Sequence, residues 1–421
     1  MGSNYKKLGP YIQVVNERNS NLNGNKLLGV SIRKCFMTSI ANTIGTDMST
    51  YKLIKKNQFA YGPVTSRNGD KISVALLDEY ENGLVSQAYV VFEIIDTNEL
   101  DPEYLMMWFR RPEFDRYARF KSHGSAREIF DWSEMYDTEL PIPSIEKQRE
   151  IVNEYNTIIN RIALNEKLIQ KLEETAQAIY KQWFVDFEFQ NENGLPYKSN
   201  DGKMVWCEEL EKEVPEGWKI KILSDFCTKI TKGTTPQIMY SEKSENAFVN
   251  YIKGESLKEN HTFDSKKTSY IDEITHKELN RSILAEYDIC YSIAGTLDKF
   301  AIVDKTILPA NTNQAIAIIR IDESKINRFF IIGLFLSNYQ IDYYNFNIQQ
   351  AVQANLSLET ISSLPIIVPE DKVINKLGFI IEKIFSNKLS IDLENQKLEE
   401  IMDLLLAKMT RVESEIKTVL K

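Results

Sequence analysis

Basic side chains gather in two short stretches of the first third of the chain. Lys52, Lys55, Lys56, Arg67 and Lys71 share a window whose only acid is Asp70. A second stretch, residues 110–127, holds five Arg, one Lys and one His against two acids. Residues 67–70, Arg-Asn-Gly-Asp, have the composition of a hairpin tip, where side chains can project into a groove. Guanidinium and ammonium groups placed there suit guanine or phosphate, so both stretches favour contact with nucleic acid.

The second half of the chain carries polar groups of a related kind. Residues 229–236, Lys-Ile-Thr-Lys-Gly-Thr-Thr-Pro, form a basic turn, and residues 349–353, Gln-Gln-Ala-Val-Gln, supply amides that suit bidentate pairing with adenine. Any one of these side chains could be ordinary solvated surface; as groups at equivalent positions of two repeats they favour binding. The predicted DNA-binding residues are Lys55, Arg67, Asn68, Lys71, Arg116, Arg119, His123, Arg127, Lys229, Lys232, Thr234, Thr235, Lys253, Gln349, Gln350 and Gln353.

The residue patterns of common enzymes are missing. There is no GxGxxG, HExxH or GxSxG, and no Asn-Pro-Pro or Asp-Pro-Pro followed by an aromatic residue, as an adenine methyltransferase needs. Residues 24–29 have the glycine spacing of a phosphate loop but lack its lysine. The four cysteines form no CxxC pair, which argues against a zinc site or a disulfide framework and fits a reducing cytoplasm. We therefore expect no catalytic residue, no metal site and no cofactor in this chain.

Charge and composition indicate a multidomain soluble protein. Hydrophobic residues make up 43% and charged residues 26% of the 421, and the start shows no secretory signal. The longest apolar run, residues 329–336, is too short to span a bilayer. The net charge is −9, but residues 185–214 hold eight acids against three lysines, which accounts for −5 of it. The remainder is near neutral, so basic faces stay possible, with a partner supplying much of the phosphate contact.

The chain repeats itself at an offset of 226 residues. Residues 171–174, Lys-Leu-Glu-Glu, recur at 397–400, and Gly69 recurs as Gly295. Each half comprises about 140 residues of short β-rich runs and short helical stretches, followed by one long helix. The sequence predicts an α+β fold that is a pseudo-two-fold tandem repeat. Two mixed α/β domains are separated by two long antiparallel coiled-coil helices.

Each long helix carries apolar residues with heptad spacing. The two helices are expected over residues 146–184 and 370–410, and each would be about 57 Å long for about 38 residues. Gly378 and Lys388 interrupt the pattern of the second helix. The seams of the first helix are Ile151, Ile158, Asn165, Leu172 and Ile179, and Tyr155, Ile162, Ile169, Ala176 and Trp183. Those of the second are Leu377, Ile384, Ile391, Leu398 and Leu405, and Ile381, Lys388, Asn395, Met402 and Met409.

An antiparallel pairing of the two helices aligns both seams in a single register. That register places Ile151 opposite Met409 and Trp183 opposite Leu377, and it brings Asn165 opposite Asn395. A buried Asn165–Asn395 pair would fix register and orientation at some cost in stability. The alternative is that both amides face water.

Several segments together resemble the specificity subunits of type I restriction–modification systems, over nearly the whole chain. They are residues 140–148, Leu-Pro-Ile-Pro-Ser-Ile-Glu-Lys-Gln, at the start of the first helix, and residues 178–187, Ala-Ile-Tyr-Lys-Gln-Trp-Phe-Val-Asp-Phe, at its end. Residues 214–223, Val-Pro-Glu-Gly-Trp-Lys-Ile-Lys-Ile-Leu, open the second half, and residues 232–236 and 250–254 match the family's early loops. The first half lacks a clear Gly-Thr-Pro loop, and the second helix begins with Pro-Glu-Asp-Lys instead of the family's Pro…Glu-Gln.

The resemblance implies five segments and a set of partners. These are target-recognition domain 1 (1–142), spacer helix 1 (143–185), a linker (186–213), target-recognition domain 2 (214–365) and spacer helix 2 (366–421). Each domain would read half of an asymmetric double-stranded DNA site, with the helices setting the gap. The helices would dock two methyltransferase subunits, which bind S-adenosylmethionine and flip out adenine, and two restriction/translocase subunits that use ATP and Mg²⁺. The location would be cytoplasmic, away from membranes.

Two other functions stay open at this point. One is a single-chain restriction or methylation enzyme, which would bind S-adenosylmethionine by itself. The other is a coiled-coil adaptor that does not touch DNA, for which exchange of Arg67 and Arg127 to alanine would leave DNA binding of the complex intact.

Overall fold

The computed structural model describes residues 5–20, 26–39, 46–66, 68–124, 127–295, 297–349 and 355–411. The chain divides into two compact units. The first unit comprises residues 1–162 and 396–421, and the second comprises residues 163–395. Within the described ranges, no helix is both long enough and apolar enough to cross a membrane.

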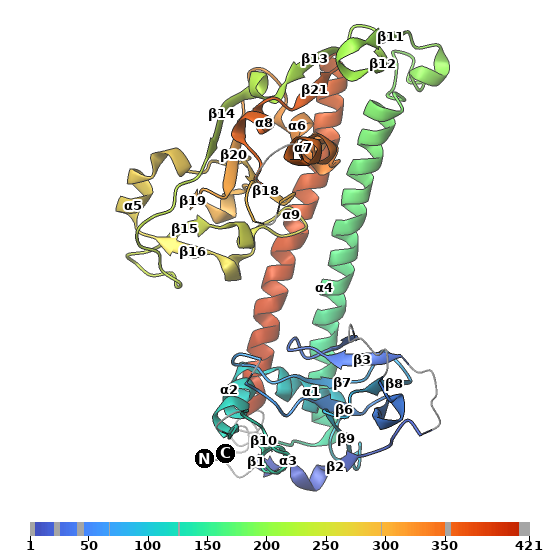
Figure 1. The fold of residues 1–421 in the computed structure, drawn as a ribbon, viewed down its shortest axis with the longest axis vertical. Helices are drawn as coiled ribbons and strands as arrows, with labels where there is room; N and C mark the ends of the chain where they lie inside the picture. The colour runs from blue at the N-terminus through green and yellow to red at the C-terminus, as the bar shows by residue number, and fades with distance from the viewer. Residues whose placement is uncertain are drawn as a thin grey trace, which may run out of the picture. The chain divides into compact units, whose positions relative to one another are not determined.

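The first unit contains two four-stranded sheets and three short helices, which we call the first sheet domain (Figure 1). One sheet is antiparallel, in the order β2 (Ile12–Val15), β9 (Val90–Ile94), β6 (Phe59–Tyr61), β7 (Val74–Leu76). The other has the order β4 (Phe36–Thr38), β3 (Leu27–Val30), β8 (Asn82–Val85), β5 (Lys52–Lys55), with β3 and β8 parallel. The remaining elements are α1 (Pro102–Arg110), α2 (Pro112–Lys121), α3 (Trp132–Tyr136), and the pair β1 (Tyr5–Lys7) and β10 (Glu139–Pro141).

The second unit builds a related arrangement, which we call the second sheet domain. Its antiparallel sheet has the order β14 (Cys227–Lys232), β20 (Ile316–Ile321), β17 (Ile289–Ser292), β18 (Phe300–Ile302). Its other sheet has the order β16 (Ser269–Ile271), β15 (Val249–Ile252), β19 (Ala310–Thr312), with β15 and β19 parallel. The remaining elements are α5 (Glu273–Glu278), α6 (Arg328–Leu336), α7 (Tyr339–Gln349), α8 (Leu358–Ser362), the pair β13 (Lys219–Ile222) and β21 (Pro365–Val368), and a linker hairpin, β11 (Met204–Cys207) and β12 (Lys212–Pro215).

The predicted duplication is confirmed by several elements at the same offset. Adding 226 to the bounds of β7, α1 and α3 gives the bounds of β18, α6 and α8 (74 + 226 = 300, 102 + 226 = 328, 132 + 226 = 358). Local chemistry is repeated as well: Asp101 caps α1 by accepting from Tyr104 N at 3.1 Å, and Asn327 caps α6 by accepting from Phe329 N at 2.9 Å. Gly69 and Gly295 both have positive φ, +61° and +82°, which is why glycine recurs in the two turns.

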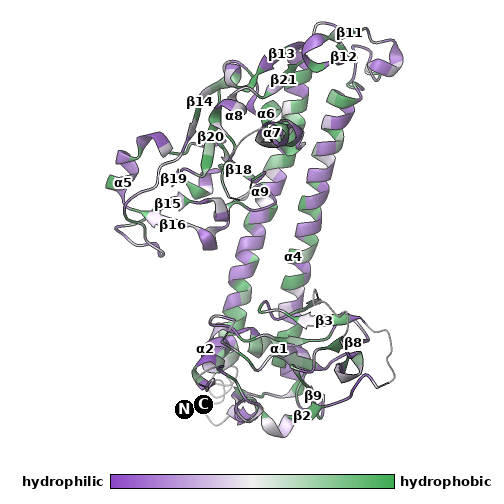
Figure 2. Ribbon diagram, viewed as in Figure 1, coloured by the Kyte–Doolittle hydropathy of each residue, from purple (hydrophilic) through white to green (hydrophobic). Residues whose placement is uncertain are grey.

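The two long helices are α4 (Ile145–Tyr180), which continues into a π-turn at Lys181–Val185, and α9 (Asp371–Lys408). Hydrophilic and hydrophobic residues alternate along both, as expected for helices that bury one side (Figure 2). Every residue of the two predicted seams is buried or half-buried. The helix bounds and the heptad pattern therefore match those predicted from the sequence.

The helices pack antiparallel within each unit. In the first unit, Ile151 and Tyr155 near the start of α4 share a core with Leu406 and Met409 near the end of α9. In the second unit, residues near the end of α4, such as Ala176, share a core with Leu377 and Ile381 near the start of α9. The early part of one helix thus meets the late part of the other in both units, as the predicted register requires.

Candidate nucleic-acid interface

Loops that carry polar side chains meet at one end of the sheet β14–β20–β17–β18. Lys232 at the end of β14 pairs with Ala317, and Ser292 at the end of β17 pairs with Ile316, so three neighbouring strands have their ends at the same edge. The turn from β17 to β18 lies at this edge too, because Tyr291 pairs with Phe300. The loops that leave this edge therefore form one surface, which we call the loop edge of the second sheet domain.

The loop of residues 232–236 is fixed at this edge by hydrogen bonds. Thr234 N donates to Thr312 O at 2.9 Å, and Arg281 donates to the Thr234 hydroxyl at 2.9 Å. The Thr235 hydroxyl bonds to Gln314. A Cβ on Gly233 would lie 2.1 Å from Thr312 O, so only glycine lets the loop approach the strand so closely. The loop holds its exposed side chains, Lys232 and Thr235, in a defined position.

Three further polar residues belong to this surface or lie near it. Asn313 N donates to Ile252 O at 3.2 Å, which places Lys253 beside the start of β20; its ammonium group pairs with Glu255 at 2.6 Å. Gln314 is exposed at the tip between β19 and β20. Lys229 lies further back in β14 and is half-buried, and burial lowers the pKa of its ammonium group. The loop edge thus gathers Lys232, Thr234, Thr235 and Lys253 with Gln314, whereas Lys229 is less accessible.

The first sheet domain brings the end of its first basic stretch next to its second stretch, at the equivalent place. Thr65 N donates to Glu128 O at 2.9 Å, and the Thr65 hydroxyl bonds to that of Ser122 at 2.9 Å. The β6–β7 turn, which contains Asn68 and Lys71, therefore lies against the segment that follows α2, which contains His123 and Arg127. Far apart in the sequence, this turn and this segment form one surface, which we call the corner of the first sheet domain.

The two domains use matching bonds to build this corner. Phe130 N donates to Pro63 O at 2.8 Å in the first domain, and Leu356 N donates to Ile293 O at 3.1 Å in the second. Phe130 and Leu356 are 226 apart in the sequence. The corner is thus part of the repeated architecture rather than an accident of one domain.

The side chains predicted to bind DNA differ in their surroundings. Arg116 pairs with Glu113 at 3.1 Å, Arg119 pairs with Glu128, and His123 lies 3.9 Å from Glu134. Lys71 and Arg127 are exposed at the corner.

Lys55 belongs to β5 in the other sheet and pairs with Glu17 at 2.7 Å, so the structure does not bring it to the corner. Outside the described residues lie Arg67, Gln350 and Gln353, and the structure describes Gln349 only as the last residue of α7.

A buried ion pair, which no sequence pattern predicted, supports the corner of the first domain. The Lys34 ammonium group lies 2.8 Å from Asp115, with both residues at least 91% buried, and it also bonds to the carbonyl of Phe109. Burial lowers the pKa of Lys34, while the carboxylate beside it acts in the opposite direction. Asp115 also accepts from Ile72 N at 3.1 Å. The pair therefore ties the β6–β7 turn to α2, where Arg116 and Arg119 stand.

The sequence analysis did not predict two residues of the loop edge of the second sheet domain, Arg281 and Gln314. Gln314 lies in a segment that recurs in both halves of the sequence. The repeat could therefore have indicated that Gln314 belongs to the interface. Arg281 lies in a stretch without a pattern, and only the fold brings it to Thr234.

Comparison with known proteins identifies the family. A family profile described as "Type I restriction modification DNA specificity domain" matches residues 19–174 and 215–403, one match in each repeat and together well over half of the chain. The chain belongs to the type I restriction–modification DNA specificity family.

Individual relatives agree with this assignment. The chain is similar to the type I restriction enzyme MjaIX specificity subunit of Methanocaldococcus jannaschii, with 25% identity over 75% of this chain and 70% of the relative. It is also similar to the HindI specificity subunit of Haemophilus influenzae, with 26% identity over 85% of this chain and 86% of the relative. The crystal structure of a type I system S subunit from M. genitalium has the same fold, with a TM-score of 0.54 and 14% identity over 96% of this chain and 95% of that one.

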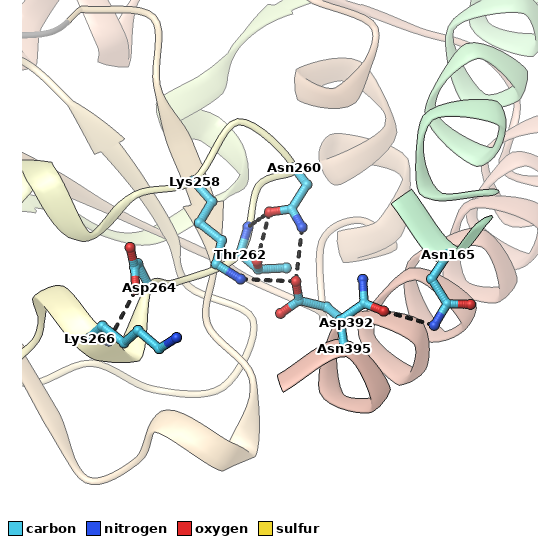
Figure 3. A network of polar contacts seen from close by, with 8 residues as sticks. All are labelled: Asn165, Lys258, Asn260, Thr262, Asp264, Lys266, Asp392 and Asn395. Atoms are coloured by element: carbon cyan, nitrogen blue, oxygen red, sulfur yellow. Dashed lines mark hydrogen bonds and ion pairs between the residues drawn. The ribbon is translucent and has the colours of Figure 1, made fainter. Parts of the chain in front are cut away.

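In this specificity subunit, a polar seam joins α9 to α4 and to the loop that contains Asn260 in the second unit (Figure 3). Asn165 Nδ2 donates to Asn395 Oδ1 at 2.7 Å, and the two residues are 2% and 8% exposed. One turn away, Asp392 accepts from Lys258 at 3.0 Å and from Asn260 at 2.9 Å. The amide contact is the one that the predicted register demands, and its role in setting that register stays a prediction.

The same seam explains the lysine that interrupts the heptads. Lys388 is 3% exposed and pairs with Glu173 across the two helices. His261, from the same loop as Asn260, lies 3.9 Å from Glu173 and stacks on Phe300 with 4.0 Å between ring centroids. Burial and the charge of Lys388 lower the pKa of His261 to about 3, so this imidazole is neutral at pH 7. Lys388 is therefore a partner in a buried ion pair rather than a defect of the seam.

Replacing Asn165 alone with leucine should lower the free energy of unfolding by about 1–3 kcal/mol, because Asn395 is left buried without its partner. Replacing both residues with leucine should restore or raise stability, while relaxing the choice of register. Urea denaturation of the three proteins measures this. A double variant less stable than either single variant would contradict the assignment of the pair as a specificity device.

The described residues include no group of three or more His, Cys, Asp or Glu side chains placed to hold a metal ion. All four cysteines are free thiols, with Cys207 and Cys290 buried. Burial raises the pKa of Cys227 to about 12, which keeps this thiol protonated and unreactive.

Proposed function

We propose that each sheet domain of this specificity subunit reads one half of a split, asymmetric DNA site, and that α4 and α9 set the gap between the halves. The observation that carries this proposal is the repetition of one loop-edge architecture in two domains, each attached to one part of an antiparallel helix pair. Exposed cations and amides at a loop edge supply phosphate contacts and base contacts together.

The proposed chemistry belongs to partner subunits. Two methyltransferase subunits would bind S-adenosylmethionine and methylate adenine, and two restriction/translocase subunits would use ATP and Mg²⁺. This chain would be a non-catalytic, cytoplasmic component that binds no cofactor. The support comes from the sequence, which carries none of the nucleotide or methyl-donor motifs that those reactions need.

The surface of the helices supports their role as a docking site. On α4, Leu164 and Leu168 are 58% and 47% exposed and lie one turn apart on the same face. On α9, Leu404 is 62% exposed and Ile401 is 45% exposed. Apolar side chains in exposed pairs on long helices suit the apolar faces of partner helices.

Replacement of Gln314 with alanine tests the assignment of the second loop edge. In the assembled methyltransferase complex, this variant should relax base preference at one position in one half-site by about 1–3 kcal/mol. Lys232→Ala should instead weaken binding to all sequences alike and reduce the slope of log K against log[salt] by about 1. Mapping of methylated adenines and salt-dependent binding assays measure the two effects.

The matched control is Lys305→Ala, since Lys305 is 79% exposed and follows β18 at the opposite end of the same sheet. This variant should bind and methylate like the native protein. If the methylated sequences show no bipartite motif, or if Lys305→Ala and Lys232→Ala behave alike, the proposed interface is wrong.

A further inference from the structure

The first unit has a hollow of about 470 Å³ beside the end of α9. Its walls include Tyr5 of β1, Trp108 of α1, Arg111, Tyr117 of α2, and Thr410 after the end of α9. The rings of Tyr5 and Trp108 meet edge to face, with 6.2 Å between centroids. The hollow is thus lined by flat aromatic surfaces, and its volume is within the range of sites that hold a large side chain or a small ligand.

Arg111 is the unusual residue of this hollow. It is 4% exposed, and its guanidinium carbon lies 4.2 Å above the Trp108 ring. One amino group is 3.3 Å from a Glu113 oxygen, whereas Nε finds no acceptor among the described residues. A buried N–H group without an acceptor is costly, so a side chain held this way in a hollow is prepared for a ligand that brings one.

The second unit shows what fills the equivalent place. Subtracting the offset from Thr410 gives Phe184, which is 1% exposed (410 − 226 = 184). Phe184 stacks on Tyr180 at 4.8 Å between ring centroids and lies 5.6 Å from Phe330 and 5.4 Å from Trp218. There the chain that follows α4 turns back and supplies large aromatic rings to the core. In the first unit a threonine stands at this position, and the hollow lies beside it.

We propose that this hollow, the α9-end pocket, receives an aromatic side chain of the methyltransferase subunit, with a neutral acceptor such as a backbone carbonyl taking the Arg111 Nε hydrogen. This inference rests on the proposed function and specifies one contact of the proposed docking. The aromatic choice follows from the rings that fill the equivalent place of the second unit. The acceptor is neutral because Glu113, Asp137 and Glu139 also line the pocket and would repel a carboxylate.

Other occupants fit less well. Residues 1–4 and 412–421, which flank the pocket along the chain, include no Phe, Tyr or Trp. A second copy of the chain cannot offer the rings that fill the equivalent place, because Phe184, Phe187 and Trp218 are buried in the core of its own second unit. The methyltransferase subunit fits best, because α9, whose end lines the pocket, is one of the two helices proposed to dock it.

Thr410→Phe tests the pocket, because it gives the first unit the side chain that the second unit carries at this position. Affinity for the purified methyltransferase subunit should fall about 30-fold or more, as for loss of an interface hot spot, while the denaturation midpoint stays the same or rises. Arg111→Met, which removes the N–H groups and keeps an unbranched apolar stem, should weaken binding about 10-fold. Thr97→Phe, at an exposed position outside the pocket, should bind like the native protein.

A photo-cross-linker at Tyr5, which is 43% exposed, identifies the occupant in the assembled complex. The expected product joins Tyr5 to a segment of the methyltransferase subunit that contains an aromatic residue. A product with this chain's own ends, with a second copy or with DNA overturns the proposal, and so does native affinity in Thr410→Phe. Failure of the native chain to bind the methyltransferase subunit at all would instead refute the proposed function.

Discussion

Replacement of Glu173 with alanine should destabilise the second unit by about 3–5 kcal/mol, because it leaves the Lys388 ammonium group buried without its carboxylate. Glu173 and Lys388 are 21% and 4% exposed at the side chain, so water cannot easily take the place of the lost partner. The double variant Glu173→Leu/Lys388→Leu should recover most of the loss, since an apolar pair of similar size removes both buried charges. Urea denaturation monitored by tryptophan fluorescence measures these differences.

The pH dependence of Glu173→Ala provides an independent check. Burial lowers the pKa of Lys388 in the folded protein, and Glu173 acts in the opposite direction. At pH values between the pKa of Lys388 in the folded protein and its higher pKa in the unfolded chain, the unfolded chain binds more protons. The free energy of unfolding therefore rises with pH in that window. Without Glu173 the folded pKa falls further and the window extends toward neutral pH. The variant should therefore gain more stability than the native protein as the pH rises from 7 to 9.

Glu174→Ala is the matched control for both experiments. Glu174 neighbours Glu173 but is 45% exposed at the side chain, and it pairs with Lys171 on the surface of α4. An exposed pair of this kind contributes about 0–1 kcal/mol. Equal losses in Glu173→Ala and Glu174→Ala would show that Lys388 does not depend on its partner across the helices.

The sequence predicted the helices and the duplication better than it predicted the site. Heptad spacing is a property of one segment read by itself, so the seam positions and the Asn165–Asn395 contact followed from counting. Lys388 looked like an interruption because its partner Glu173 lies on a helix 215 residues earlier in the chain, outside any local pattern. Local periodicity shows which side of a helix is buried but cannot show what a buried charge meets there.

The loop edges depend even more on the fold. Arg281 reaches Thr234, and Lys34 reaches Asp115, across distances in sequence that no spacing rule spans. Lys55 illustrates the opposite error, since it shares a basic window with Lys71 but belongs to another sheet. Composition therefore located the basic stretches, whereas the sheet order decided which of their side chains share a surface.

Lengthening both helices tests the proposal that they set the gap in the recognised DNA. Residues 158–164 of α4 are expected opposite residues 396–402 of α9 in the predicted register, with which the Asn165–Asn395 bond agrees. Whole heptads copied at both places should therefore keep the seams and this pair aligned. Three added heptads extend each helix by about 31 Å at about 1.5 Å per residue, close to one turn of DNA at about 34–36 Å. The two half-sites would again face the same way, and the gap in the methylated motif should grow by about nine base pairs at about 3.4 Å per pair.

A single added heptad gives a different result if the helices act as a ruler. It extends the pair by about 10.5 Å, or about three base pairs, which leaves the half-sites roughly a third of a DNA turn out of phase. Methylation should then be lost, although the protein folds as before. Three heptads added to α4 alone should abolish function by breaking the register. An unchanged gap in the doubly extended protein would show that something other than α4 and α9 sets the distance, because only a rigid spacer converts a fixed number of helical turns into a fixed number of base pairs.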